Sequence, residues 1–535
     1  MSTSEYSEDS QFEEYIFSGK ILNNSYILID KIGSGTFATV WSCYDIKTKN
    51  YLAIKIQDME EHDCAMDELT FHRTMLKGGN VGGAHNYIST MLDFFVLESD
   101  YGSHDCFVFH LAACSTYDII RYIKYSKNEE VSPLSLLNIK RIIYQTLLAI
   151  KSINDNYNLL HTDVRAENIL VMGSDKKLDL FKSIFDFKQI EKLVSLKKKK
   201  FIKKYKKKKL PIEIETQFYE ESSIGYIQKI LEDERFLEFK SNDSDDDNSH
   251  NNKDSESLSS NSGSESLSVS ISTSNSGSNS NNCKTGLCTI NNNNDNIASV
   301  SGNCNDSAKI NHNLNKPRYE HYDSFHDLDE FINEVPSDEI IYDKEINSLS
   351  IDTKYLNKIQ IRLADFGSAC FSDKKYNMIQ ARHYRAPEVV IGYPFNESCD
   401  IWSLGCLLFE LITGDVLFKP NKSPYISRNK HHLYKMYQLL GPIPNNMIEK
   451  CKYRKIFFNH DYTLKIDKRI VELNMFDFIR SEINSRSVKI ILSDDELNQM
   501  IEFLMLTFEY DPEKRSKAGN LINHKWFDDI KINIQ

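Results

Sequence analysis

The chain has 535 residues, a formal net charge of −12 and a hydrophobic content of 40%. This length allows either several domains or one large two-lobed domain with an insert. No apolar run is long enough to span a bilayer, and the acidic start MSTSEYSEDSQFEEY does not resemble a signal peptide, so we expect no membrane segment. The eleven cysteines follow no framework spacing, which is typical of a reduced cytosolic or nuclear protein. The negative charge argues against a nucleic-acid surface over the whole protein.

Composition divides the chain into parts. We expect an acidic N-terminal extension at 1–25, a mixed domain in two parts at 26–172 and 356–528, an insert between them at 173–355, and a tail at 529–535. The insert opens with a helix-like stretch at 178–194, followed by a basic run. An acidic, Ser/Asn-rich tract then follows, which cannot bury enough apolar surface to offset the loss of chain entropy. We therefore expect disorder over much of 240–320.

The first motif is KIGSGTFATVW at 31–41, which follows the strand-like YILID. Glycines at 33 and 35 allow the backbone to approach a phosphate closely, although an ordinary Gly-rich hairpin would have the same pattern. The next strand, YLAIKIQ, carries Lys55, which could reach nucleotide phosphates. Such a lysine needs an anion to hold it, and Glu68 is the best candidate, with Glu60 and Glu61 also near.

Two further motifs supply acidic and amide side chains. The stretch LLHTDVRAENILV at 159–171 gives His161, Asp163 and Asn168 the spacing H-x-D-x-x-x-x-N, and ADFGSA at 364–369 contains Asp365. Phosphoryl transfer needs Mg²⁺ to neutralise phosphate charge and a carboxylate to orient the attacking hydroxyl. We expect Asp163 to accept the hydroxyl proton, and Asn168 and Asp365 to bind Mg²⁺.

The ordered set of motifs resembles the eukaryotic protein kinases. Within them it resembles the CMGC group, and most closely the SR-protein kinases and the related LAMMER (Clk-type) kinases. The segments that carry this resemblance are GTFATVW, HTD in place of HRD, ARHYRAPEVVIG at 381–392, FELITGDVLFKP at 409–420 and LGPIPNNMIEKCKYRKIFF at 440–458. The resemblance implies an α+β, two-lobed protein-kinase fold, with a small β-rich N-lobe, a large helical C-lobe and a long, largely disordered insert. It also implies a serine/threonine protein kinase that uses ATP and Mg²⁺.

The family's site can be carried over residue by residue. Besides Asp163, the catalytic set would be Lys55, Glu68 and Arg165. The gatekeeper would be Phe109, and the hinge would be His110, Leu111 and Ala112. Glu388 should pair with Arg515, and Asp400 should bond the catalytic-loop backbone. The nucleotide would contact Ile32, Gly33, Ser34, Gly35, Thr36, Phe37, Val40, Ala53, Lys55, Phe109, Leu111 and Leu170.

Three departures from the usual kinase pattern bear on activity. Thr162 replaces the Arg that binds a phosphorylated activation loop, and the segment NMIQARH before Tyr384 has no Ser or Thr. The phosphate receptor and the phosphate site are thus missing together, which predicts an enzyme that is active without loop phosphorylation. Arg165 replaces the usual Lys and keeps its charge with a different geometry, so we expect reduced activity. A pseudokinase scaffold and a module that binds RNA or another partner through the basic insert are the alternatives.

The remaining expectations concern partners. Ten lysines lie between Lys197 and Lys209. This run could contact RNA, an import receptor or an anionic membrane, or it could be a solvated charge run. We expect a monomer that acts on protein Ser/Thr hydroxyls, in the cytoplasm, the nucleus or both. The segment KPNKSPYISRNKHHLYK at 419–435 has no acidic residue, whereas SR-protein kinases are acidic there, so we expect weak processive phosphorylation of long Arg/Ser domains.

Overall fold

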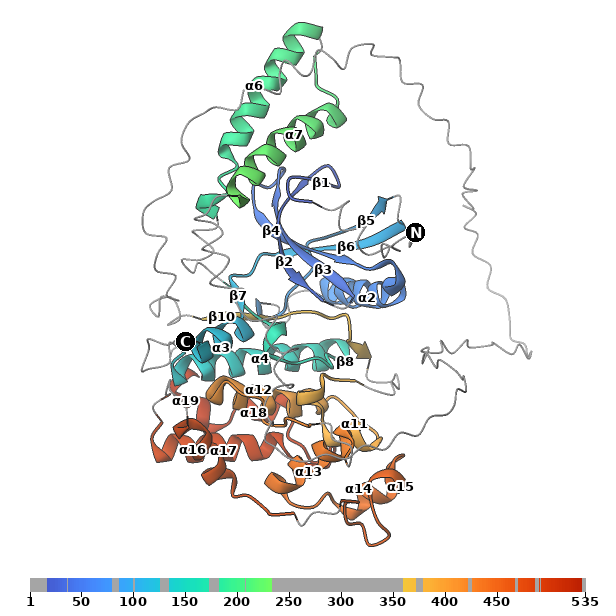
Figure 1. Cartoon of the computed structure of the whole chain (residues 1–535), viewed down its shortest axis with the longest axis vertical. Helices are drawn as coiled ribbons and strands as arrows, with labels where there is room; N and C mark the ends of the chain where they lie inside the picture. Colours follow the sequence, from blue (N-terminus) through green and yellow to red (C-terminus); the bar gives the residue numbers. More distant parts are fainter. Residues whose placement is uncertain are drawn as a thin grey trace, which may run out of the picture. The chain divides into compact units, whose positions relative to one another are not determined.

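The structure is a computed structural model, in which the described residues belong to one compact unit (Figure 1). The expected disorder at 240–320 falls outside the described residues. Those residues are 17–35, 37–78, 86–99, 102–125, 134–172, 182–206, 208–232, 359–371, 379–421, 426–466, 470–485, 490 and 492–531. Within these ranges, none of the helices combines the length and the apolar character that crossing a bilayer requires.

The small lobe is built on an antiparallel sheet with the strand order β1-β2-β3-β4-β6-β5. One long helix, α2 (His62–Gly78), lies against it and buries Ala65 and Leu69 in a cluster with Met91 and Phe107. The sheet buries a second cluster that includes Leu28, Ile54 and Val108. The strands are β1 (Ile21–Leu22), β2 (Tyr26–Ser34), β3 (Ala38–Asp45), β4 (Tyr51–Gln57), β5 (Asp93–Ser99) and β6 (Gly102–His110).

Strand pairing joins the two separated parts of the mixed domain. β9 (Ile169–Met172) pairs antiparallel with β10 (Gln360–Leu363), so that Met172 lies opposite Gln360. The side chain of Gln145 secures this junction, since it donates to the carbonyl of Ile359 and accepts from the amide of Ile361. β7 (Cys114–Ser115) completes this sheet, and β8 (Leu159–Leu160) pairs with β11 (Cys370–Phe371). The insert therefore leaves and returns at neighbouring points.

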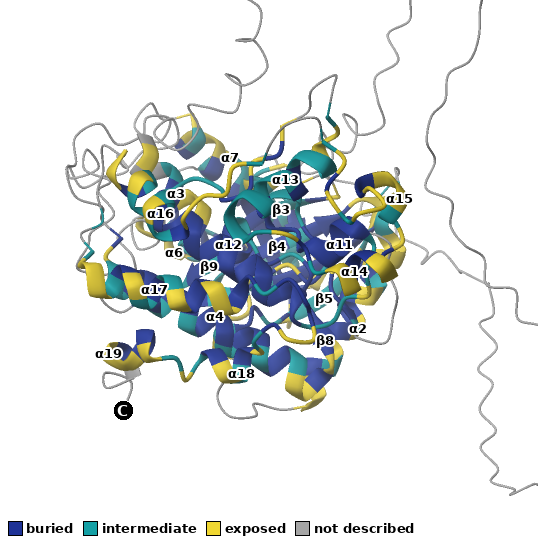
Figure 2. Ribbon diagram, turned by 90° about the horizontal axis from the view of Figure 1, so that it is seen from below, coloured by how far each residue is buried: buried dark blue, intermediate teal, exposed yellow. Residues whose placement is uncertain are grey.

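The large lobe is helical and is organised around α12 (Cys399–Thr413), in which every residue is buried (Figure 2). Gly405 allows the helix α17 (Asp494–Thr507) to approach, because a Cβ there would collide with Thr507 and Phe508. The other elements are α3 (Thr116–Tyr125), α4 (Leu136–Tyr157), η3 (Ala166–Asn168), η5 (Arg382–Tyr384), α11 (Pro387–Ile391), α13 (Arg428–Leu440), α14 (Asn445–Lys450), α15 (Arg454–Phe457), α16 (Met475–Asn484), α17 (Asp494–Thr507), α18 (Ala518–Leu521), η6 (Lys525–Phe527) and α19 (Asp528–Lys531). The predicted two-lobed α+β fold is confirmed.

The first part of the insert, for which we expected a helix at 178–194, is folded. It forms two helices, α6 (Lys188–Tyr205) and α7 (Ile212–Leu231), which pack against each other. The expected helix at 178–194 therefore begins later and continues through most of the basic run. The reason is the regular spacing of apolar groups on α6, where Ile190, Val194 and the stem of Lys197 are buried.

This helical hairpin is attached to the small lobe by specific contacts. The ring of Phe187 stacks on that of Tyr44 with centroids 4.5 Å apart. The hydroxyl of Tyr44 donates to Oε1 of Glu191 at 2.6 Å, and Tyr51 donates to the carbonyl of Phe185. On the other helix, Ile224 approaches Gly19 so closely that a Cβ on Gly19 would lie 2.6 Å from its Cα. The hairpin therefore covers apolar surface of the small lobe.

We predict that Phe187→Ala lowers the free energy of unfolding by about 3–5 kcal/mol, because it leaves a cavity against Tyr44. Chemical denaturation of the purified chain measures this change. Leu196→Ala is the matched control, since Leu196 is exposed on α6 and its loss should have little effect. Replacing 180–350 by a short linker should also destabilise the fold, because it removes the contact between Phe187 and Tyr44. An equal effect of both point variants would contradict this.

Candidate active site

The centre of the site is an ammonium group between two carboxylates. Lys55 on β4 lies 2.9 Å from Oε2 and 3.2 Å from Oε1 of Glu68, which is on α2. The same Nζ lies 2.8 Å from Oδ1 of Asp365, which follows β10. The structure thus brings together three of the residues that the sequence singled out. Glu60 and Glu61, the alternatives to Glu68, lie in η1 (Met59–Glu61) and have no contact of this kind.

Electrostatics keep all three groups charged. Burial opposes the charge on Lys55, but Glu68 and Asp365 outweigh it and hold the pKa of Lys55 above its ordinary value. Burial acts in the opposite direction on Asp365, yet Lys55 lowers the pKa of this carboxyl to about 2. Burial is likewise overcome at Glu68, where Lys55 lowers the pKa. Two ionised carboxylates can therefore lie close together at neutral pH, because one cation is shared between them.

The catalytic-loop motif forms a second cluster. The amide nitrogen of Asn168 donates to the backbone carbonyl of Asp163 at 2.9 Å and to its Oδ2 at 2.8 Å. Nε of Arg165 lies 3.1 Å from the same Oδ2, and it lies 3.9 Å from Glu167. The carboxylate of Asp163 is therefore held from two sides. Asn168 uses only its amide nitrogen in these bonds, which leaves its oxygen as a donor for a cation.

The turn that presents Asp163 is strained and is held in place. Thr162 has φ of 63°, an unusual value for a β-branched residue. Asp400 on α12 accepts from the amides of His161 at 2.7 Å and Thr162 at 2.8 Å, as the resemblance implied. Burial raises the pKa of Asp400, and these two bonds counteract the rise. The hydroxyl of Thr162 also donates to the carbonyl of Ser368 at 2.6 Å, and this bond ties the loop to the segment after Asp365.

The expected nucleotide-binding residues are spread over the small-lobe sheet and β9. Val40 lies opposite Lys55 on neighbouring strands, and Ala53 lies opposite Phe109. Ile32, Gly33 and Ser34 are on β2, Gly35 and Phe37 are in the turn after it, Leu111 follows β6, and Leu170 is on β9. Ile32 and Phe37 are exposed. Thr36 lies outside the described residues.

The Gly-rich turn fits a phosphate group. A Cβ added to Gly33 would come no closer than 3.5 Å to Val40, and one added to Gly35 no closer than 3.6 Å to the carbonyl of Ala38. The protein's own packing therefore does not require glycine at either position. Two glycines that packing does not need, beside Lys55, leave free the space that a phosphate requires. The oxygen donors of Asp365 and Asn168 are the type that Mg²⁺ prefers.

Two residues near Glu68 carried no sequence motif. Gln57 donates to Oε2 of Glu68 at 3.3 Å, and the two residues lie on different elements of the small lobe. His72, one turn after Glu68 on α2, is 1% exposed and packs near the rings of Phe109 and Phe366. A buried imidazole beside a catalytic carboxylate could not be inferred from spacing alone. Its position depends on rings from β6 and from the segment after β10, which are far from α2 in the sequence.

The described end of the activation segment is fixed by Gln380, a residue that we did not single out. Its side chain donates to the carbonyl of Cys399 and to the hydroxyl of Ser403, both at 2.8 Å, and accepts from the amide of Ala386 at 2.9 Å. Arg385 in turn donates to the carbonyl of Gln380 at 2.7 Å. All of these bonds join groups of the chain itself, so this end of the segment is held without an added phosphate. The part of the segment at 372–378 lies outside the described residues.

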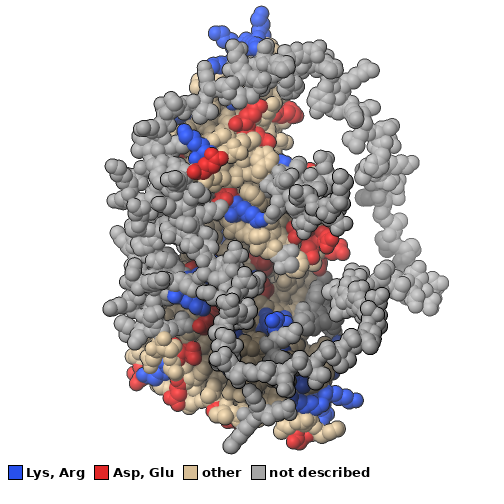
Figure 3. All heavy atoms as spheres, viewed as in Figure 1, with Lys and Arg blue, Asp and Glu red and all other residues tan. Residues whose placement is uncertain are grey.

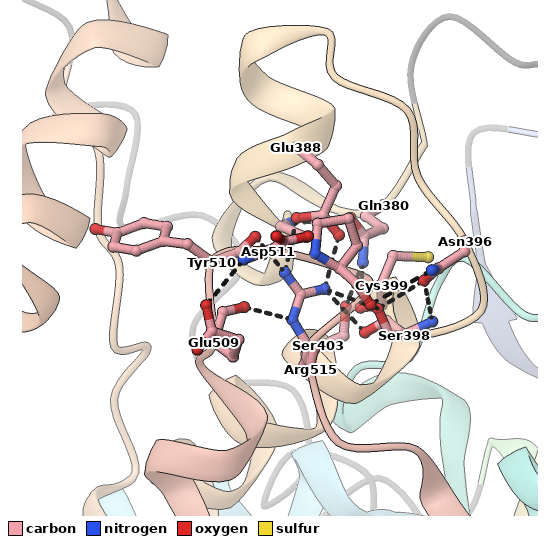
Figure 4. A network of polar contacts seen from close by, with 12 residues as sticks. Gln380, Glu388, Asn396, Ser398, Cys399, Ser403, Glu509, Tyr510, Asp511 and Arg515 are labelled. Atoms are coloured by element: carbon pink, nitrogen blue, oxygen red, sulfur yellow. Dashed lines mark hydrogen bonds and ion pairs between the residues drawn. The ribbon is translucent and has the colours of Figure 1, made fainter. Parts of the chain in front are cut away.

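The predicted pair of Glu388 and Arg515 is buried and bidentate (Figure 4). The two nitrogen–oxygen distances are 2.7 and 2.8 Å, and both side chains are fully buried. Arg515 also donates to the carbonyl of Ser398 at 3.0 Å, and its guanidinium lies over the ring of Trp402. Its Nε donates to the carbonyl of Glu509 at 2.8 Å and its Nη2 to that of Tyr510 at 3.3 Å, which satisfies the remaining donors, without which a buried ion pair would be costly. The pair anchors the activation segment to the large lobe.

Basic groups gather between the activation segment and α13. Arg382 donates to Asn429 at 3.1 Å, which joins η5 to the start of that helix. Burial, with the positive charges of Lys419 and Arg382, lowers the pKa of His383, so these side chains are electrostatic neighbours. Lys419 and Arg428 are exposed. The basic segment seen in the sequence is therefore presented beside the activation segment.

Comparison with known proteins gives a consistent result. The protein kinase domain family matches residues 26–207 and 344–527. The chain is 30% identical to putative serine/threonine-protein kinase L205 of Acanthamoeba polyphaga mimivirus, over 98% of this chain and 90% of that protein. It is 28% identical to serine/threonine-protein kinase SKY1 of Saccharomyces cerevisiae, over 94% and 74% of the two chains. It is 25% identical to SRSF protein kinase 3 of Homo sapiens, over 95% and 87%.

The match covers both parts of the mixed domain and includes all the motifs of the site. The relatives are named as serine/threonine kinases, and SR-protein kinases are among them. Membership of this family implies the use of ATP and Mg²⁺ and a protein substrate. The chain belongs to the protein kinase family and is a serine/threonine protein kinase of the SR-protein kinase type.

Proposed function

We propose that the kinase reaction is carried by Asp163, Lys55, Glu68, Asn168 and Asp365 acting as one site. The observation that supports this most is the position of Lys55 between Glu68 and Asp365. When bound, ATP and Mg²⁺ supply the phosphoryl group and the positive charge that neutralises it. Asp365 and Asn168 would hold the metal, and Lys55 would orient the nucleotide phosphates. Asp163 would accept the proton of the substrate hydroxyl.

Arg165 has a supporting part in this proposal. Its guanidinium contacts the carboxylate that we assign as proton acceptor, at 3.1 Å. Burial opposes its charge, but Asp163 and Glu167 outweigh that effect and raise the pKa of Arg165. The group is thus a permanent cation beside the reaction centre. A lysine at this position would carry the same charge on a more freely rotating group, which can reach the transferring phosphate more easily. We infer that Arg165 orients Asp163 well but contacts the transferring phosphate less well.

We predict that Asp163→Asn reduces kcat by about 10³-fold, because the general base is lost while its bond from Asn168 is retained. Asp365→Asn should reduce kcat as strongly and also weaken Mg²⁺-dependent nucleotide binding. Arg165→Lys should give equal or higher turnover. Steady-state kinetics with a short peptide, alongside thermal unfolding to verify the fold, measures all three. Full activity in either aspartate variant would refute the assignment, and a pseudokinase would show no turnover in any form.

We predict that phosphatase treatment leaves activity nearly unchanged, since bonds among the chain's own groups hold the described end of the activation segment without a phosphate. Gln380→Ala should instead lower activity about tenfold or more, because buried bonds worth about 1–3 kcal/mol each are lost. Gln228→Ala, an exposed glutamine on α7, is the matched control and should have no effect. A large loss after phosphatase treatment that a phosphomimetic at Ser372 or Tyr376 restores would contradict this account.

We infer that substrate selection differs from that of kinases with an acidic docking groove. A surface that carries exposed Lys419 and Arg428 repels an Arg/Ser repeat and attracts acidic or phosphorylated segments. Each exposed contact contributes only about 0.2–1 kcal/mol, but several of them act together. Short Arg-containing peptides can still be substrates if acidic residues nearer the site contact a single arginine.

We therefore predict weak, non-processive phosphorylation of a long Arg/Ser domain compared with short peptides. The double variant Lys419→Glu/Arg428→Glu should bind the long domain more tightly than the natural chain does, and the difference should shrink as salt is added. Binding and product-ladder assays at low and high salt measure both effects. A tight, salt-sensitive complex between the natural chain and the long domain would show that acidic docking survives elsewhere on the surface.

We also propose that the basic run at 197–209 contacts RNA or an import receptor. We further propose that the kinase acts in the nucleus, the cytoplasm or both. Support comes from the exposure of most of its described lysines on α6 and in the turn after it. We infer that the kinase acts as a monomer.

A further inference from the structure

The lysines of α6 are not distributed evenly around the helix. At 100° per residue, the buried or half-buried positions 190, 194, 197, 201 and 205 fall on one face, toward α7 and the small lobe. Lys192, Lys199 and Lys203 are separated by seven and four positions, so they share one face, and it lies opposite the buried one. All three are exposed, as are Lys206, Lys208 and Lys209 in the following turn. We name these six residues the lysine stripe.

The lysine stripe is held rigidly. Lys197, on the buried face, donates to the hydroxyl of Ser222 at 3.1 Å and lies over the ring of Phe218. Lys198, beside it, bonds both oxygens of Glu215 at 2.9 and 3.0 Å. With Phe187 stacked on Tyr44, these contacts fix the helix on the small lobe. The exposed lysines therefore form a preformed row and need little ordering when a partner binds.

The row has no internal counterion among the described residues. Two acidic groups of the hairpin are already engaged, Glu191 by Lys49 and Tyr44, and Glu215 by Lys198. Like charges four positions apart, such as Lys199 and Lys203, also oppose helix formation. A stable helix that keeps these charges uncompensated has its unpaired charge available for an anionic partner. Figure 3 shows Lys and Arg side chains gathered at the end of the molecule that the hairpin forms.

The geometry favours a linear polyanion. Fourteen residues separate Lys192 from Lys206, which on a helix is about 21 Å, with neighbouring charges about 5–10 Å apart. The phosphates of a nucleic acid repeat at a similar spacing. When lysines bind them, the counterions condensed on the phosphates are released, and this release drives binding without a shaped pocket. A bilayer would need the apolar face of α6, which is already packed against α7. An acidic peptide gains less from counterion release.

We propose that the lysine stripe is a nucleic-acid contact surface, which binds the phosphate backbone without reading sequence. It lies on the small lobe and apart from Lys55, Asp163 and Asp365, so binding there is independent of phosphoryl transfer. Lysine gives single point charges rather than the fork of arginine, and no described aromatic side chain is fully exposed beside the stripe for stacking on bases. Affinity should therefore depend on salt and hardly at all on base composition.

The test is fluorescence anisotropy of the full chain with a single-stranded RNA of about 20 nucleotides over a salt series, without ATP. The stripe variant is Lys192→Gln/Lys199→Gln/Lys203→Gln, and the matched control is Lys450→Gln/Lys452→Gln/Lys455→Gln, three exposed lysines on and near α14 and α15. Each neutralised phosphate adds about 0.7 to the magnitude of the slope of log K against log salt, so removing three lysines should reduce that magnitude by about 2. The stripe variant should also bind RNA at least about tenfold more weakly than the natural chain at low salt. The control should match the natural chain.

Three results would overturn the proposal. One is the absence of salt-dependent RNA binding by the natural chain, and another is equal weakening in the stripe and control variants. The third is tighter, stripe-dependent binding to a poly-glutamate peptide or to phosphatidylserine vesicles, which would assign the surface to an acidic protein or a membrane. Circular dichroism verifies that both variants are folded. RNA binding is measured without nucleotide, and the stripe variant should phosphorylate a peptide as fast as the natural chain does. A failure of this proposal can therefore be distinguished from a failure of the proposed catalytic roles.

Discussion

The contact on which the rest of the structure depends is that of Lys55 with two carboxylates. Glu68 comes from α2, thirteen positions away, whereas Asp365 is 310 positions away in the sequence. The site is therefore complete only when β9 and β10 have paired and brought the two parts of the domain together. A fully buried Glu68 without its lysine would be costly, so the same pair that prepares the site also links α2 to the sheet.

Backbone strain is concentrated at the same place. Thr162 and Asp365, on the two segments that meet at the site, both adopt left-handed backbone conformations, with φ of 63° and 64°. Such conformations are costly and persist only where surrounding bonds enforce them. Asp400 enforces the first through two backbone amides, and the bond from Thr162 to Ser368 ties both segments together. Asp400 belongs to the buried helix α12, so the core of the large lobe fixes the position of the catalytic loop.

The sequence was sufficient to predict the fold class and the charged centre of the site. Lys55, Asp163 and Asp365 are each embedded in a motif whose spacing follows from the chemistry, and Glu68 was preferred over the two nearby acids Glu60 and Glu61. Gln57, His72 and Gln380 were missed because their partners lie on other elements, and no local pattern records a bond such as that from Gln380 to Ser403. Side-chain bonds across long sequence distances depend on the folded backbone, which single-sequence reasoning does not supply.

The insert shows the same limit in a different form. Its composition correctly marked a change in the chain, but the basic run concealed an amphipathic helix, since lysine stems can serve as apolar surface when a neighbouring ring covers them. Lys197 over Phe218 is such a case. The loop entropy needed to leave β9 and return to β10 rises only slowly with length, so a long insert is tolerated there. What makes its first part more than a tolerated loop is the burial of Phe187 against Tyr44, which makes the hairpin an integral part of the small lobe and gives its outward lysines a fixed position.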